Sequence, residues 1–176
     1  MIRQWLSEDR ERMAMLELAA GQGLSDWCLA AGFVRNLVWD RLHGYRPATA
    51  LNDIDLIHFD REDMSKARDR RIEQDLARRT GLPWSVKNQA RMHERNHDAP
   101  YASTRDAMSY WVEIETAVGA ALDEDGAVVL ISAFGLDPLF DLTITLNDTR
   151  PKPEAFEKRV RGKRWLQFWP KLVVNT

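Results

Sequence analysis

Two aspartates separated by one residue, Asp53 and Asp55, form the pattern in this chain that most clearly suggests chemistry. In a strand, side chains two positions apart point to the same face, so both carboxylates would stand side by side. Their neighbours Ile54, Leu56 and Ile57 indicate a buried strand, where two like charges repel and lose solvation. A divalent cation between the carboxylates offsets the free-energy cost of this repulsion and desolvation. Oxygen ligands favour Mg²⁺, with Mn²⁺ as an alternative, so we predict that the two aspartates hold a metal and take part in catalysis.

Phosphate-binding features lie earlier in the chain, at a glycine between a predicted strand and a predicted helix. Gly32 lets the backbone approach a ligand closely, and the N–H group of Phe33 points outward at the helix N-terminus, which suits an anion. Arg35 and Asn36 lie in the first helical turn, where a guanidinium can contact a phosphate through two hydrogen bonds. A glycine at such a junction is often only a packing residue. Together with the two aspartates, however, this turn predicts a site for a phosphorylated ligand that carries a divalent metal.

A second group of polar residues follows the strand predicted over residues 84–88. Asn88 could hydrogen-bond a ribose or base, Arg91 could neutralise a phosphate, and His93 could transfer a proton near neutral pH. The alternative is a capped turn in which His93 packs against Tyr101. The sequence favours neither, and we include these three residues among the predicted nucleotide-binding residues.

The elements that position these residues follow from apolar periodicity and turn signals. We predict helices over residues 7–22, 33–42, 62–80, 103–113 and 153–172. We predict strands over residues 27–31, 53–59, 84–88, 118–122, 128–133 and 139–146. Helices and strands alternate early, whereas a turn at Asp125-Gly126 indicates an antiparallel hairpin later. The sequence therefore predicts a single α+β domain over residues 1–176, with a small mixed β-sheet flanked by helices.

The overall composition restricts the function further. The 176 residues carry a net charge of −2, so there is no strong DNA-binding signal of the kind that a basic chain gives. The single cysteine, Cys28, excludes a disulfide framework and favours a reducing, cytoplasmic location. No apolar run is long enough to cross a membrane, so we expect no membrane partner.

Several segments resemble a known family. The turn Ala31-Gly32-Phe33-Val34-Arg35-Asn36 and the strand Asn52-Asp53-Ile54-Asp55-Leu56 resemble the signature of the polymerase-beta-like nucleotidyltransferase superfamily. Further segments resemble a stand-alone bacterial nucleotidyltransferase-like family, long catalogued as a domain of unknown function: residues 84–93, 100–101, 116–119, 134–137 and 163–165. The resemblance implies an NTP substrate, attack of a hydroxyl acceptor on the α-phosphorus, and release of pyrophosphate. It leaves the acceptor open among a small molecule, a protein side chain and an RNA end.

The chain departs from the superfamily in two ways. In the superfamily the turn is commonly Gly-Gly or Gly-Ser, whereas here it is Ala31-Gly32. In the superfamily the strand beside the aspartate strand also usually carries a third carboxylate. Here that strand offers Ser85 or Lys87 instead. Asp141, on a later predicted strand, is the first candidate for the third acid, and Glu113 and Glu115 come next, although each has an alternative role as a surface or capping acid. Without a third acid, a catalytically reduced nucleotide-binding or regulatory module is the alternative function.

The C-terminal segment, residues 153–172, is basic and aromatic. A nucleic-acid surface combines cations for phosphates with aromatic rings for stacking, so an RNA-binding domain is a further alternative. The slightly acidic chain favours instead an amphipathic helix, with Val160, Trp165, Phe168 and Trp169 packed inward and the cations in water.

Overall fold

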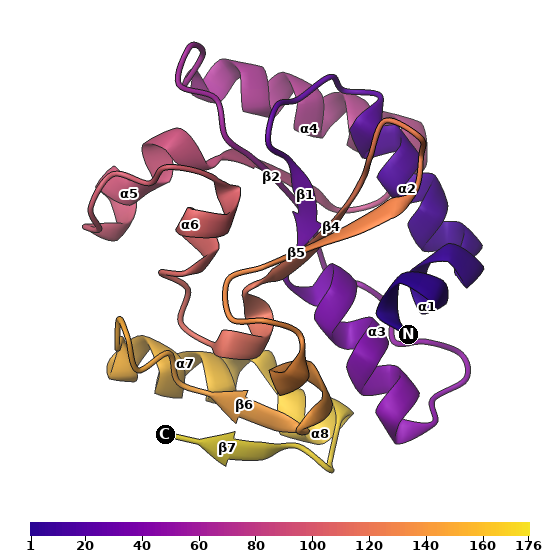
Figure 1. Cartoon of the computed structure of the whole chain (residues 1–176), viewed down its shortest axis with the longest axis vertical. Helices are drawn as coiled ribbons and strands as arrows, with labels where there is room; N and C mark the ends of the chain where they lie inside the picture. The colour runs from indigo at the N-terminus through magenta and orange to yellow at the C-terminus, as the bar shows by residue number, and fades with distance from the viewer.

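The computed structural model describes residues 1–176 and has a five-stranded mixed sheet at its centre (Figure 1). The strand order is β3-β2-β1-β4-β5, where β2 and β3 are parallel and the other pairs are antiparallel. The strands are β1 (Cys28–Ala30), β2 (Ile54–His58), β3 (Trp84–Asn88), β4 (Val118–Leu122) and β5 (Val128–Ser132). A separate pair of short parallel strands comprises β6 (Thr143–Thr145) and β7 (Val173–Asn175). The predicted α+β class is confirmed.

Helices connect these strands. The α-helices are α1 (Ile2–Glu8), α2 (Arg10–Ala20), α3 (Gly32–His43), α4 (Lys66–Thr80), α5 (Met92–Asn96), α6 (Thr104–Met108), α7 (Pro153–Lys163) and α8 (Trp165–Phe168). The short 3-10 helices are η1 (Gln89–Arg91), η2 (Ile114–Thr116) and η3 (Asp137–Phe140). None of the helices is both long enough and apolar enough to span a bilayer.

Four predicted helices have other bounds in the structure. The helix predicted over residues 7–22 is two helices, because Asp9 leaves the helical conformation and accepts the Arg12 N–H as an N-cap. The helix predicted over residues 62–80 begins later, where Ser65 caps α4. The helix predicted to end near residue 113 already ends at Met108. The predicted C-terminal helix breaks at Arg164, whose φ of 56° ends α7.

One face of the sheet is fully covered and the other is only partly covered. Helices α1 to α4 pack on the first face, around a cluster that includes Leu16, Phe33 and Leu76. The second face carries a smaller cluster around Ile57 and Met108, to which α6 contributes. Because side chains alternate along a strand, Asp55 and Ile57 of β2 point to this second, more open face, and Asp53 immediately precedes the strand.

The C-terminal segment packs against α3 and forms a third cluster. Its members are Trp39, Ile144, Phe156, Trp165, Trp169 and Leu172. The Trp39 ring lies 6.1 Å from Trp165 and 5.2 Å from Trp169 between centroids. The inward packing predicted for these two C-terminal tryptophans is therefore confirmed, and their rings are not available to stack on RNA bases. Phe168 was expected inside as well, but 45% of it is exposed.

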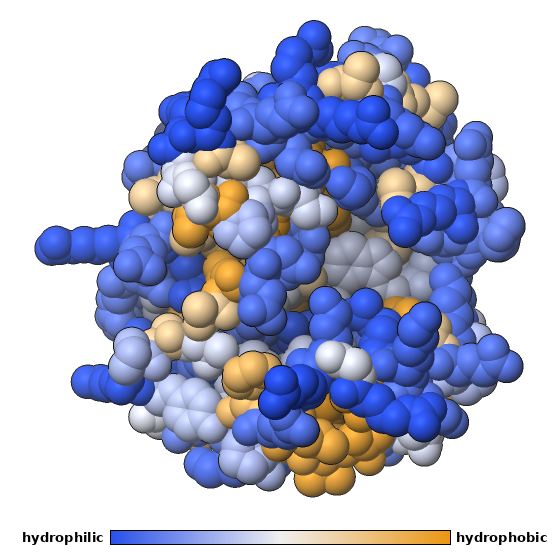
Figure 2. All heavy atoms as spheres, turned by 180° about the vertical axis from the view of Figure 1, so that it is seen from behind, coloured by the Kyte–Doolittle hydropathy of each residue, from blue (hydrophilic) through white to orange (hydrophobic).

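The reverse face of the molecule is mostly hydrophilic, with an apolar area at its lower edge (Figure 2). Near the C-terminus the exposed large hydrophobic side chains are Leu166, Phe168, Val173 and Val174.

Candidate active site

The turn between β1 and α3 has an unusual backbone. Ala31 has φ 56° and ψ −118°, a conformation that a residue with a Cβ rarely adopts. The hydrogen bonds of α3 begin with the N–H of Arg35 donating to the Ala31 carbonyl. The N–H groups of Gly32, Phe33 and Val34 precede that bond and have no helical acceptor. As expected from the sequence, these groups lie at a helix N-terminus.

Polar side-chain atoms gather above Gly32. A Cβ added at this position would lie 3.4 Å from Asn36 Nδ2 and 3.6 Å from Arg35 Nη2. The absence of a side chain therefore leaves a small space between the backbone and these two donors.

Arg35 is a buried cation whose hydrogen-bond acceptors are all neutral. Only 6% of the residue is exposed, and its guanidinium lies 4.9 Å from the Trp39 ring centroid and 4.7 Å from that of Trp165. It donates to Thr116 Oγ1 at 2.7 Å and to Asn36 Oδ1 at 2.9 Å. Burial lowers its pKa to about 10, so the charge persists at neutral pH. A fixed cation with neutral acceptors is suited to an anionic ligand.

Asp53 and Asp55 lie close enough for their charges to interact. Burial raises the pKa of Asp55, and the charge of Asp53 raises it further. Lys163 and Arg35 act in the opposite direction through their charge, as does the hydroxyl of Ser85, which faces Asp55 in the β2–β3 register. As anticipated, this neighbouring strand offers no acid opposite Asp55. The structure contains no group of three or more His, Cys, Asp or Glu side chains that could hold a metal ion.

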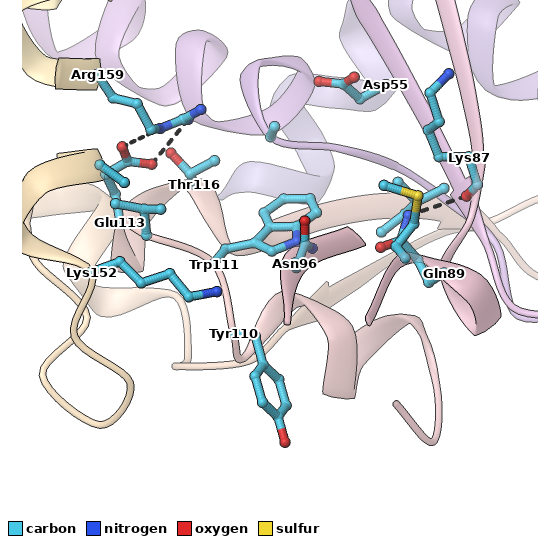
Figure 3. Close-up of a pocket in the computed structure, with 15 residues that line it drawn as sticks. Asp55, Lys87, Gln89, Asn96, Tyr110, Trp111, Glu113, Thr116, Lys152 and Arg159 are labelled. Carbon is cyan, nitrogen blue, oxygen red and sulfur yellow. Dashed lines mark hydrogen bonds and ion pairs between the residues drawn. The ribbon is translucent and has the colours of Figure 1, made fainter. Parts of the chain in front are cut away.

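Two hollows adjoin these carboxylates. The first, which we call the turn pocket, has a volume of about 190 Å³. Its lining includes Gly32, Arg35, Asn36, Asp53, Lys163 and Trp165. The second, which we call the sheet pocket, has a volume of about 450 Å³ and lies on the open face of the sheet (Figure 3). Its lining includes Asp55, Lys87, Gln89, Trp111, Glu113 and Thr116.

The two hollows meet at the aspartate pair. Asp53 faces the turn pocket and Asp55 the sheet pocket. Arg35, which lines the turn pocket, donates a hydrogen bond to Thr116, which lines the sheet pocket, so the linings of the two pockets are in direct contact. The arrangement provides two binding volumes on either side of one acidic centre.

The second predicted group of polar residues does not join this site. The Asn88 side chain is fully buried, where it donates to the carbonyls of Asp60 and Asp63 and accepts the Ala90 N–H. It holds a loop in place, and its burial leaves it no exposed atom for the contact to ribose or base that the sequence suggested.

Arg91 and His93 also have structural partners. Arg91 forms an ion pair with Asp69, which also accepts from His58 at 2.9 Å. Burial alone would raise the pKa of Asp69. The hydrogen bonds from His58, the Asn88 N–H and Arg91 have the larger combined effect and lower that pKa below its ordinary value. His93 packs edge-on against Tyr101 at 6.0 Å, the alternative considered from the sequence. The structure therefore gives both residues partners within the protein and does not bring them to the aspartate pair.

The candidate third acids have other surroundings. Asp141 is exposed and follows η3 instead of lying on a strand, because the segment predicted as a strand over residues 139–146 divides into η3 and β6. Glu113 is bound by Arg159 through two contacts of 2.5 and 3.1 Å. Glu115 accepts from Thr143 Oγ1 at 2.8 Å and the Thr145 N–H at 2.9 Å, and burial raises its pKa. None of the three joins Asp53 and Asp55 in a three-acid group.

Sequence reasoning did not identify Lys163, Thr116 and Trp111 as site residues. Lys163 ends α7 beside the turn pocket, and Trp111 and Thr116 line the sheet pocket. Lys163 and Thr116 do fall within segments that carried the family resemblance, and this was the one available signal.

A mixed sheet with a glycine turn beside two paired aspartates defines a nucleotidyltransferase of the polymerase-beta-like type. Comparison with known proteins agrees. A family model described as nucleotidyltransferase matches residues 17–174, and the chain belongs to this family.

Solved structures support the assignment. One that "reveals a CCA-adding enzyme head domain" is 34% identical, with a TM-score of 0.88 over 99% of this chain and 95% of that one. A CCA-adding enzyme in complex with CTP matches with a TM-score of 0.65 at 16% identity, and a tRNA-processing enzyme in an apo form with 0.56 at 18% identity. These two share the fold, and the chain spans only 43% and 42% of their lengths. No curated protein matches the chain.

Proposed function

We propose that this chain transfers a nucleoside monophosphate from an NTP to a hydroxyl acceptor in the presence of Mg²⁺ and releases pyrophosphate. The observation that carries the proposal is the position of Asp53 and Asp55 beside the Gly32 turn, with the buried Arg35 cation above that turn. Family membership supports the class of reaction, and the neighbour determined with CTP supports a nucleotide as the donor.

The aspartate pair has the properties of a Mg²⁺ site. The pKa of Asp55 is raised by burial and by Asp53, so the ionised pair is costly without a cation, and Lys163 and Arg35 influence it only at a distance through charge. Mg²⁺ in phosphate-handling sites commonly takes one or two protein carboxylates and completes its shell with water and substrate phosphates. Mn²⁺ accepts the same ligands. Once bound, the ion would supply charge neutralisation at the phosphate and at the attacking oxygen.

The turn pocket is suited to the β- and γ-phosphates. The N–H groups at the start of α3 point at an anion placed there, and Arg35 supplies a fixed guanidinium from inside the protein. Lys163 adds a cation from the end of α7. In this arrangement the residues of the chain position the triphosphate and offset its charge, which is the main protein contribution to phosphoryl-type transfer.

Measuring both nucleotide binding and pyrophosphate release tests this function. We expect NTPs to raise the melting temperature only in the presence of Mg²⁺, and Asp53→Asn to abolish that shift and most of the pyrophosphate release. Asp125→Asn, on an exposed hairpin turn, is the matched control and should behave as wild type. Unchanged nucleotide transfer by Asp53→Asn would rule out the proposed metal site.

A second function remains a proposal because no third acid joins the pair. A nucleotide-binding module without turnover would show the Mg²⁺-dependent thermal shift but no pyrophosphate release with any acceptor. The two measurements together separate an enzyme from such a module.

A further inference from the structure

The sheet pocket lies where an attacking hydroxyl has to approach, given the proposed function. In nucleotidyl transfer the attacking oxygen and the departing pyrophosphate lie roughly in line on opposite sides of the phosphorus. With the β- and γ-phosphates in the turn pocket, pyrophosphate leaves toward Gly32. The opposite side of the aspartate pair is the one that Asp55 faces, and it opens into the sheet pocket.

The cations that line the sheet pocket are already neutralised. Lys87 lies 3.2 Å from Glu73, Lys152 lies 3.0 Å from Asp98, and Arg159 contacts Glu113. A nucleic-acid strand gains most of its affinity from cations that are free to contact successive phosphates. Paired cations do not provide that gain, so the pocket is better matched to a ligand without charge.

The remaining lining combines a flat ring with neutral polar groups. The Trp111 ring lies in the middle of the view in Figure 3, between the Glu113 and Gln89 side chains. Gln89 and Asn96 each use the amide nitrogen within the protein, on the Lys87 carbonyl and the Tyr101 hydroxyl respectively. Their carbonyl oxygens remain as acceptors for ligand hydroxyls. The volume of about 450 Å³ lies within the range of small-molecule sites.

We propose that the sheet pocket binds the acceptor, and that the acceptor is a small uncharged hydroxyl compound with a flat ring, of which a nucleoside is an example. The ring stacks on Trp111 while a hydroxyl group reaches Asp55. The acceptor oxygen forms a bond to the α-phosphorus, the bond between that phosphorus and the bridging oxygen breaks, and pyrophosphate leaves with the electron pair. The hydroxyl proton passes to water.

The test measures pyrophosphate release by the full chain with Mg²⁺, a mixture of the four NTPs and one of three probes. The probes are adenosine, ribose, and a short RNA oligonucleotide with a free 3′ hydroxyl. We expect adenosine to stimulate release at least about tenfold over water, and more than ribose, because stacking on an aromatic side chain strengthens binding by about that factor. We expect the RNA to give no greater stimulation than ribose.

Variants of the pocket connect this activity to its residues. Trp111→Ala should raise the KM for adenosine about tenfold and leave the KM for NTP unchanged, and Trp111→Phe should restore most of the loss. Should Trp111→Ala not fold, Asn96→Ala tests the same pocket from an exposed position and should also raise the KM for adenosine.

The outcomes separate this inference from the proposed function. Stimulation by RNA alone, or none by adenosine, overturns the acceptor class. An equal rise in the KM for NTP in Trp111→Ala overturns the assignment of the pocket, because the pocket would then hold the nucleoside of the donor. In all of these cases Mg²⁺-dependent NTP binding by the wild type would leave the proposed function intact, whereas its absence would overturn both.

Discussion

Ala31 shows how a single residue can store strain at a site. Its φ of 56° and ψ of −118° place a methyl group in a region that glycine enters freely. In the superfamily that the chain resembles, this turn is commonly Gly-Gly or Gly-Ser, and here an alanine occupies its first position. The strain is held by the buried hydrogen bond from the Ala31 N–H to the Val118 carbonyl, at 2.8 Å.

We therefore expect Ala31→Gly to raise the free energy of unfolding by about 1–2 kcal/mol. Ala14→Gly, at an exposed position inside α2, is the matched control and should lower it by about 0.5–1 kcal/mol. Urea denaturation of both variants measures the two values. A loss of stability in both would show that Ala31 is not strained.

The aspartate pair gives a pH-dependent prediction at the same scale. Because the pKa of Asp55 in the folded state lies above its ordinary value, ionisation of this group destabilises the fold as the pH rises. The destabilisation by the ionised Asp55 is fully present above the pKa that this group has in the folded protein. It disappears below the ordinary aspartate pKa of about 4, where the group is protonated in both states.

Asp55→Asn should therefore melt at a higher temperature than wild type at pH 7 when Mg²⁺ is absent, and the difference should shrink toward pH 4. Melting curves across this range measure the effect, with Asp125→Asn as the control. An Asp55→Asn protein that is less stable at pH 7 would indicate that the carboxylate has a structural partner.

At the scale of elements, the C-terminal segment forms part of the site. Helix α7 ends at Lys163, and the break at Arg164 turns Trp165 onto the Arg35 guanidinium. A continuous helix over residues 153–172, as the periodicity predicted, would not make this turn. The break depends on a positive φ at an arginine, for which the sequence carries no local signal.

Lys163 is exposed beside the turn pocket and its amino group forms no ion pair, so we expect it to contribute charge there and little to the stability of the fold. We expect Lys163→Gln to weaken Mg²⁺–NTP binding roughly 3–10-fold and to leave the melting temperature unchanged. Isothermal titration calorimetry measures the affinity. Lys158→Gln, an exposed position on the same helix, should bind as wild type, and equal weakening in both variants would point to net charge alone.

At the scale of the whole molecule, local sequence patterns identified the glycine turn and the aspartate pair of the candidate site. They did not identify the residues from later parts of the chain that line its two pockets. The glycine turn and Asp53-x-Asp55 are short motifs on adjacent strands, so strand alternation is sufficient to place them. Trp111 and Lys163 reach the site from later parts of the chain through tertiary packing, which one sequence does not reveal. The polar residues after β3 have partners within the protein instead: the Asn88 amide, for example, satisfies backbone groups of a loop, which the sequence pattern does not reveal.

The packing of Arg35 against two indole rings has an optical consequence. Trp39 and Trp165 touch the guanidinium that would meet the triphosphate, and Trp169 adjoins them. Indole emission is sensitive to nearby charge and to solvent. The protein therefore carries intrinsic fluorophores at the turn pocket, and we expect nucleotide titrations to be measurable from its own emission without any label.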